Sequence, residues 1–262
     1  MRRLFCLSLC LFWLILCAAC GVSSSDDSAG SASPTPDGVV TESPSMTPLP
    51  DGPADSVVVR EDFWEHAPAE SPPLLMTSAS FPFLEDHGRP ELAAISEQLL
   101  DIREGFYTRC EQMLEEARAR RDEGSAAEAS VCTFTYAVER NDGGVLSLRY
   151  EQYRYIDGGA HGETETRCAT YDLHTGRRLY LEDFVTTPGG IDALVRAVAE
   201  QCGLYPEDYY PDYALLAREC LPYDAFCVTP DGIALFYPEL TLAPLMAGVL
   251  RFDIPWAALE TP

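Results

Sequence analysis

A glycine-rich loop that carries a histidine is the stretch of this sequence whose residue types could do chemistry. The loop covers residues 157–162, DGGAHG, and two tyrosines precede it at alternating positions. Three glycines within five residues allow backbone conformations and close approaches that residues with a Cβ resist. The candidate binding residues in and before the loop are Tyr153, Tyr155, Gly158, Gly159 and His161.

His161 has the most distinctive setting of the four histidines, the others being His66, His87 and His174. A histidine can act as a general base, a metal ligand or a hydrogen-bonding side chain. The sequence identifies no partner for the first two roles, so we expect the ring to bond backbone groups and fix the loop. His-Glu-x-x-His, Gly-x-Ser-x-Gly and a phosphate-binding glycine loop with its lysine are all missing from the sequence. We therefore predict no catalysis, no cofactor and no metal site.

Two groups of tyrosines could instead recognise a partner. Tyr153 and Tyr155, with Arg154 between them, combine the residue types that dominate binding hot spots, but they could equally form one core face and one rim of a strand. A second group, Tyr205, Tyr209, Tyr210 and Tyr213, lies beside Glu207, Asp208 and Asp212. This second group is typical of a contact with a glycan or a cationic protein, and packing under a helix is the alternative.

Six cysteines fall in the part of the chain that we expect to fold: Cys110, Cys132, Cys168, Cys202, Cys220 and Cys227. An even number outside the cytoplasm indicates up to three disulfides. Cys202 and Cys220 flank a short helical segment and are our preferred pair, whereas Cys110 and Cys132 fall on apolar faces and could be core thiols. Their spacings do not fit a zinc site.

The N-terminus reads as an export signal followed by a tether. Residues 1–20 combine two arginines, a short apolar run and small residues before Cys20, the pattern of a lipoprotein signal peptide. We expect Cys20 to be lipidated, the alternative being an ordinary secretory signal cut nearby. Residues 21–56 are rich in Ser, Pro, Asp and Gly without an aromatic residue, so we expect a disordered linker.

The chain is strongly acidic. Its 42 acidic residues face 18 basic ones, all arginine, for a net charge of −24. Removal of the signal takes Arg2 and Arg3 with it, which leaves 16 arginines and a net charge of −26. Such a surface repels nucleic acid and attracts cations or basic proteins, although the acids could also serve solubility alone.

Residues 57–262 are predicted to form one α+β domain of two intimately packed halves, 57–156 and 157–262. Apolar residues at spacings of three and four predict a long helix over 90–121 with a buried stripe: Leu92, Ile95, Leu99, Ile102, Phe106, Cys110, Met113 and Ala117. Alternation predicts strands over 74–83, 131–138, 145–155 and 167–172, and an apolar pattern resumes over 179–184. A shorter helix over 191–202, another over 211–220 and strands over 226–228, 232–237 and 249–254 complete the plan of antiparallel sheets packed against one long and one shorter helix.

Two motifs carry a resemblance to a known family. The first is Gly158-Gly-Ala-His161 followed by Tyr171-Asp-Leu-His-Thr-Gly-Arg-Arg-Leu-Tyr-Leu-Glu-Asp-Phe184; the second combines Phe226–Ile233, Leu242–Gly248 and Phe252–Trp256. Over roughly residues 57–259 the chain resembles the extracellular domain of RsiV-type anti-sigma factors, which also precedes the catalytic module of some peptidoglycan deacetylases. The family's tyrosine and glutamate before Leu242 are missing here, and Leu245 replaces its second tyrosine.

The resemblance and the signal together imply a function outside the cell. We expect a lipoprotein on the extracellular face of the bacterial cytoplasmic membrane, whose RsiV-like domain binds a partner without catalysis. The resemblance implies a lysozyme-sensing surface, so a basic protein such as lysozyme is the expected partner, or else cell-wall glycan, and not nucleic acid. Because the sequence has no second membrane-spanning run, we expect sequestration rather than signalling. The alternatives are an enzyme or enzyme accessory that acts on peptidoglycan, and a structural envelope protein.

Overall fold

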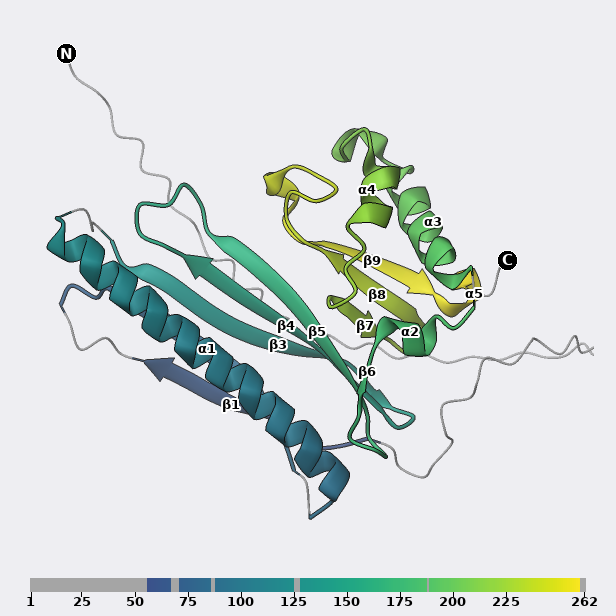
Figure 1. Cartoon of the computed structure of the whole chain (residues 1–262), viewed down its shortest axis with the longest axis horizontal. Coiled ribbons are helices and arrows are strands. Elements are labelled where there is room, and N and C mark those ends of the chain that lie inside the picture. Colours follow the sequence, from purple (N-terminus) through teal and green to yellow (C-terminus); the bar gives the residue numbers. More distant parts are fainter. Residues whose placement is uncertain (1–55, 67–70, 86–87, 125–127, 188, 260–262) are drawn as a thin grey trace, which may run out of the picture. The chain divides into compact units, whose positions relative to one another are not determined.

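The computed structural model describes residues 56–66, 71–85, 88–124, 128–187 and 189–259. The predicted signal peptide with Cys20, nearly all of the predicted linker, and His87 lie outside these ranges. The described part is a mixed α+β structure, as predicted, with nine strands in two largely antiparallel sheets (Figure 1). No helix within it has the length and apolar composition needed to cross a membrane.

The first sheet has six strands in the order β1-β2-β3-β4-β5-β6. Their bounds are β1 Val59–His66, β2 Leu75–Leu84, β3 Ser130–Asp142, β4 Val145–Tyr155, β5 Glu163–Asp172 and β6 Arg178–Leu179. All neighbours are antiparallel except β2 and β3, which are parallel because helix α1 (Pro90–Asp122) crosses over between them. The predicted strands and the long helix are therefore confirmed, whereas β1 was not predicted.

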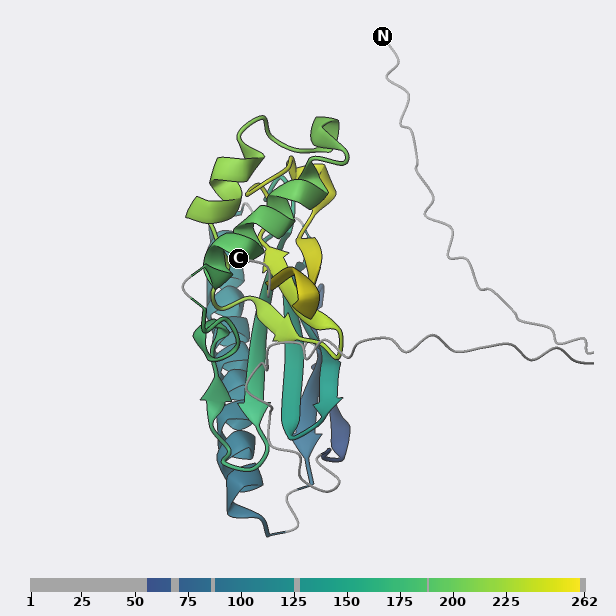
Figure 2. The same cartoon turned by 90° about the vertical axis from the view of Figure 1, so that its right-hand side faces the viewer.

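Helix α1 lies along one face of the first sheet (Figure 2). Seven residues of the predicted stripe are buried, and Ile102 is half-buried. The ring of Phe106 lies 5.7 Å from Phe81 and from Phe134, and 6.0 Å from Trp64 of β1. An aromatic cluster thus joins the helix to three strands. Val138, the last residue of the strand predicted over 131–138, is 42% exposed, and β3 has a register shift directly after it.

The second sheet has the order β7-β8-β9, with β7 Phe226–Val228, β8 Gly232–Tyr237 and β9 Leu250–Pro255. Its apolar side packs against the helices α3 (Gly190–Cys202), α4 (Tyr213–Glu219) and α5 (Trp256–Leu259). The predicted helices and strands are again present. The apolar pattern at 179–184 divides between β6 and a short helix, α2 (Leu181–Phe184), and two 3-10 turns, η1 (Pro206–Asp208) and η2 (Leu245–Ala247), lie in the connections.

Contacts of two kinds join the two halves of the domain, defined from here on as the first sheet (β1 to β6) with α1, and the second sheet with α2 to α5. Cys168 of β5 shares a small buried cluster with Ala225, Cys227, Ala234 and Phe236 of the second half. Around it, Glu139 forms ion pairs with Arg149 (2.8 Å) on its own sheet and Arg251 (2.9 Å) on the other. The expected intimate packing is thus built from a buried thiol cluster with an ionic rim.

Candidate functional site

The structure brings the glycine loop and the two tyrosines together at the ends of β4 and β5. Tyr153 pairs with Thr164 across the strands, and its ring lies against Gly162. A Cβ on Gly162 would lie 2.2 Å from the tyrosine hydroxyl, so a larger residue there would displace the Tyr153 ring. Gly158 has a φ of +78°, and a Cβ on Gly159 would lie 2.9 Å from the carbonyl oxygen of Ile156. The glycines therefore have the two roles predicted for them, close approach and a left-handed backbone.

His161 is exposed, and its Nδ1 lies 2.9 Å from the carbonyl oxygen of Gly162. This is the predicted kind of contact, in which the ring bonds the loop backbone. Within the described residues, no group of three or more His, Cys, Asp and Glu side chains is arranged to hold a metal ion.

Asp157 anchors the loop, a role that the sequence did not indicate. The residue is only 6% exposed, and its Oδ1 accepts a hydrogen bond from the N–H of Glu128 at 3.1 Å. Its own N–H donates to Ser130 Oγ at 3.1 Å, and its carbonyl oxygen accepts from the guanidinium of Arg120. The loop is therefore tied to the start of β3 and to the C-terminal turn of α1. An aspartate before two glycines is the one local signal, because that residue type often bonds nearby backbone in turns.

The tyrosines differ in their exposure. Tyr153 is 39% exposed, Tyr155 is half-buried, and Arg154 points to the other face, where it pairs with Glu163 at 2.7 Å. The three residues thus form a strand with alternating faces, as the alternative interpretation predicted, and Tyr153 keeps an accessible ring. Thr133 and Thr164 pair with it on the neighbouring strands. An exposed ring beside hydroxyl-bearing residues can contact a sugar or a protein surface.

The second tyrosine group is mostly part of the core. The ring of Tyr209 lies 6.1 Å from Tyr213 and 6.4 Å from Phe252 of β9. Burial raises the pKa of the Tyr209 hydroxyl, and the nearby Cys202 adds to this shift. Tyr205 differs, because it is 63% exposed and follows Leu204, which is 71% exposed. Packing therefore accounts for Tyr209 and Tyr213. Tyr210 is half-buried and its N–H donates to the carbonyl oxygen of Leu242, and Tyr205 is the exposed member of the group.

A second surface, which the sequence analysis missed, lies in the β8–β9 loop, residues 238–249. Leu242 and Ala243 are buried at 0% and 3% exposure, and the N–H of Tyr210 donates to the carbonyl oxygen of Leu242 at 2.9 Å. On either side of this anchor the loop exposes apolar side chains, Leu240 at 55% and Met246 at 100%. Leu240 has a φ of +61°, a conformation rare for leucine. The loop therefore has an unfavourable backbone conformation at Leu240 and exposes two large apolar side chains to water.

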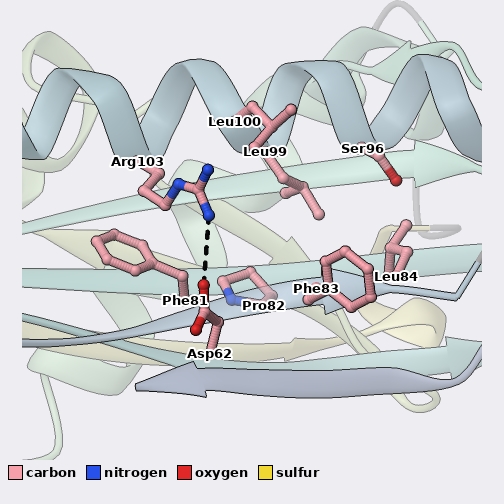
Figure 3. A pocket seen from close by; sticks show the side chains of 9 residues that line it. All are labelled: Asp62, Phe81, Pro82, Phe83, Leu84, Ser96, Leu99, Leu100 and Arg103. Atoms are coloured by element: carbon pink, nitrogen blue, oxygen red, sulfur yellow. Dashed lines mark hydrogen bonds and ion pairs between the residues drawn. The ribbon is translucent and has the colours of Figure 1, made fainter. Parts of the chain in front are cut away.

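A small pocket lies between α1 and the strands β1 and β2 (Figure 3). Its volume is about 60 Å³, and it is lined by Asp62, Phe81, Pro82, Phe83, Leu84, Ser96, Leu99, Leu100 and Arg103. Arg103 Nη1 pairs with Asp62 Oδ2 at 3.3 Å across its mouth. Ligand pockets usually enclose roughly 300–1,000 Å³, so this pocket suits one or two waters rather than a cofactor. Buried Ser96 Oγ and Arg103 Nε, which have no hydrogen-bond partner among the described residues, could be satisfied by such water.

The six cysteines considered above are free thiols in the structure. Cys202 is fully buried beside Tyr209, whereas Cys220 is exposed, so the structure does not show the expected pairing of these two. Cys110 and Cys132 do lie in the core, as one interpretation of the sequence held.

The arrangement defines a class: an α+β domain with two sheets, two separate apolar cores, and exposed apolar side chains on structured loops. Comparison with known proteins agrees with this at the level of the fold. The model of a family described as protein of unknown function (DUF3298) matches residues 183–257, which cover α3, α4 and the whole second sheet. No curated protein matches the chain significantly.

Two crystal structures of DUF3298 family proteins are similar to the chain. One, from Bacteroides fragilis, is 16% identical with a TM-score of 0.55, and the match covers 79% of this chain and 93% of that one. The other, from Pseudomonas aeruginosa, is 17% identical with a TM-score of 0.48, and the match covers 78% and 92%. At such identity the first likeness shows a shared fold and leaves the function open.

Proposed function

We propose that this protein is a lipoprotein of the bacterial cell surface, anchored through Cys20, whose domain binds a basic partner without catalysis. The best single candidate is a secreted muramidase of the lysozyme kind, which the resemblance to RsiV-type domains implies. The observation that carries the proposal is the β8–β9 loop, which fixes Leu240 and Met246 in exposed positions on a strongly acidic domain.

The geometry of this loop suits recognition. Burial of apolar surface is the main favourable term in most protein–protein associations, and this loop offers two large apolar side chains for such burial. The loop is held at its centre by the buried Leu242 and by the hydrogen bond from Tyr210. A loop that is already ordered loses less entropy on binding. Met246 and Leu240 therefore have the properties of anchors for a partner.

Charge supplies the choice of partner. Glu239 lies in the loop, and Glu207 and Asp208 lie in η1, a few residues before the Tyr210 contact. Together with the net charge of −24, these acids attract a cationic protein over a distance and raise its association rate. Such attraction extends about 8 Å at physiological salt. The apolar anchors then determine how long the complex lasts.

A second candidate, binding of cell-wall glycan in support of a peptidoglycan enzyme, is favoured by the exposed ring of Tyr153 beside Thr133 and Thr164. The two candidates use different surfaces in different halves of the domain. Substitutions at Met246 and Tyr153 therefore separate them.

The test is a binding titration of the mature chain, made lipid-free by Cys20→Ser, with lysozyme at low salt and at about 0.15 M salt. We expect saturable binding at both, with slower association at the higher salt. Met246→Ser should weaken binding at least tenfold, about 1.4 kcal/mol, mainly through faster dissociation. The matched control is Met76→Ser, since Met76 is 54% exposed on β2 in the first sheet, and it should bind like the parent chain.

Three results would contradict parts of this proposal. Binding only at low salt would reduce the attraction to nonspecific charge. An equal loss in Met246→Ser and Met76→Ser would remove the loop from the interface, and retention of the chain on purified peptidoglycan that Tyr153→Ser abolishes would favour the glycan candidate. Cell fractionation tests the anchor: Cys20→Ser should move the protein from the membrane to the medium or stall its processing.

A further inference from the structure

Four of the six cysteine thiols in the described structure form two close pairs. The first pair joins Cys110 of α1 to Cys132 of β3, which are 7% and 0% exposed in the same apolar core. Their thiols share a hydrogen bond. Gln152 Nε2 approaches Cys132 Sγ at 3.6 Å from the neighbouring strand, which holds this sulfur under the helix.

The second pair joins the two sheets. Cys168 of β5 and Cys227 of β7 are 3% and 0% exposed in the cluster where the halves meet, and their thiols also share a hydrogen bond. Backbone contacts place them independently. The N–H of Cys168 donates to the carbonyl oxygen of Asp224 at 3.2 Å, and Cys227 Sγ donates to that of Leu148 at 3.6 Å. Leu148 is paired with Ala169, the residue after Cys168.

We propose that these pairs close two disulfides, Cys110–Cys132 and Cys168–Cys227, and that Cys202 and Cys220 stay as thiols. A disulfide needs two side chains that already face each other across a short gap, and thiols that share a hydrogen bond meet this condition. The first bond would join α1 to the sheet that it covers, and the second would join the two halves. The inference rests on the packing of the domain and not on its proposed partner.

Each bond forms by exchange with the disulfide of an oxidant molecule. A thiolate of the pair attacks one sulfur of an oxidised dithiol protein or of a small disulfide such as oxidised glutathione, and a mixed disulfide forms. The other cysteine then attacks the chain's sulfur in this mixed disulfide, and the oxidant leaves as a thiol. Two S–H bonds of the chain and the oxidant's S–S bond break, while one S–S bond of the chain and two S–H bonds of the reduced oxidant form. The two electrons go to the oxidant with the two protons.

Burial determines when this can happen. The hydrogen bond that the Cys110 thiol donates to Cys132, and then burial, raise the pKa of Cys110, and burial raises that of Cys168. In the folded domain Cys110 and Cys168 are therefore protonated. The hydrogen bond with Cys110 lowers the pKa of Cys132, but this sulfur is 0% exposed and out of reach of an oxidant, since attack needs an accessible thiolate. We expect the disulfides to close during folding, while the thiols are still in water, and to resist reduction afterwards.

The experiment is refolding of the reduced mature chain carrying Cys20→Ser in a mixture of reduced and oxidised glutathione. Remaining thiols are then alkylated, and the chain is digested without reductant for mass spectrometry. We expect two cross-linked peptide pairs, 110 with 132 and 168 with 227, and two alkylated residues, Cys202 and Cys220. Cys168→Ala should leave Cys227 as an additional free thiol, and Cys110→Ala should do the same for Cys132. The control Cys220→Ala should leave both links in place.

Six alkylated thiols in a chain with native circular dichroism would overturn the proposal, and so would a link between Cys202 and Cys220. If the chain does not refold, the same digestion is made on protein isolated from its membrane without reductant. The same two links are required there, and their absence has the same meaning. Absence of the links together with intact lysozyme binding would contradict the disulfides and leave the proposed function unaffected. Presence of the links without lysozyme binding would contradict the proposed function and leave the disulfides unaffected.

Discussion

Ser147 is a buried hydroxyl on which contacts between the two sheets depend. It is 0% exposed between two leucines of β4, and its Oγ lies 2.8 Å from Thr170 Oγ1, which is also 0% exposed. The N–H of Val228 on β7 donates to the same Oγ at 3.0 Å. One serine oxygen therefore satisfies a hydroxyl of its own sheet and a backbone group of the other sheet. We predict that Ser147→Ala destabilises the whole domain.

The size of the effect follows from the groups left without partners. A buried donor that loses its acceptor costs about 1–3 kcal/mol, and Ser147→Ala strands the N–H of Val228 and removes the partner of Thr170. The methyl of alanine fits the space, so no steric cost is added. We expect a loss of about 2–4 kcal/mol in the free energy of unfolding. Thr170→Val keeps the acceptor for Val228 and should cost about 1–2 kcal/mol.

The double variant gives the sharper measurement. With both hydroxyls gone, only the N–H of Val228 is unsatisfied, so the combined loss should be smaller than the sum of the single losses by about 1 kcal/mol or more. Equilibrium unfolding in urea measures all three, with the four chains in the same thiol state. Trp64 reports on the first half and Trp256 on the second, and circular dichroism reports on both.

Thr135→Val is the matched control, because Thr135 is an exposed residue of β3 in the same sheet, and its change should stay within about 0.5 kcal/mol. A loss below about 0.5 kcal/mol for Ser147→Ala would refute the argument. Strictly additive single variants would refute it as well, since they would show that the two hydroxyls do not act together.

Two further predictions concern a close backbone contact and an ionised side chain. A Cβ on Gly232 would lie 2.0 Å from the carbonyl oxygen of Ile254, so Gly232→Ala should push β9 away and lower the free energy of unfolding in urea by more than about 2 kcal/mol. The control Gly105→Ala, which has open space in α1, should instead stabilise the domain by about 0.5–1 kcal/mol. Equal effects of the two substitutions would contradict the geometry. Burial alone would raise the pKa of Asp183, but hydrogen bonds from Arg177 and the Tyr180 N–H outweigh it and lower the pKa. The stabilisation is therefore complete above the unfolded pKa of about 3.9 and is lost as pH falls through the lower folded value. Asp183→Asn should cost less than about 1 kcal/mol at pH 7, because the side chain is 31% exposed, and the difference from the parent should vanish in acid; a difference that persists at pH 2 would contradict this assignment.

The sequence predicted those elements whose pattern is repeated several times along the chain. The stripe on α1 has eight members, so its period is clear even though Ile102 is only half-buried. Strand β1 was missed because it is an edge strand with mostly exposed charged residues, and only Trp64 and its neighbours reach the core. The parallel pairing of β2 with β3 was also missed, since the residues of a strand do not indicate whether its neighbour is parallel or antiparallel.

The candidate site divides in a similar way. The glycines at 158, 159 and 162 were predicted correctly because a missing Cβ has a direct geometric meaning. The exposure of Leu240 and Met246 could not be predicted, because apolar residues within an apolar segment favour burial. In the structure Leu240 has a positive φ, and the N–H of Tyr210 bonds the buried Leu242 between the two exposed side chains. The thiol pairs depend likewise on tertiary contacts between elements far apart in the sequence.

The polar residues of the glycine loop that could do chemistry are bonded to the backbone of the chain. Asp157, whose carboxylate would be a natural candidate in a catalytic loop, is only 6% exposed and bonds the backbone of Glu128. His161 is exposed and bonds the carbonyl of Gly162. These polar groups fix the backbone, and the two surfaces proposed for a partner are centred on Tyr153 and on Leu240 with Met246. Because the two surfaces belong to different halves with separate cores, each can be altered without the other, and the binding data will assign the partner to one of them.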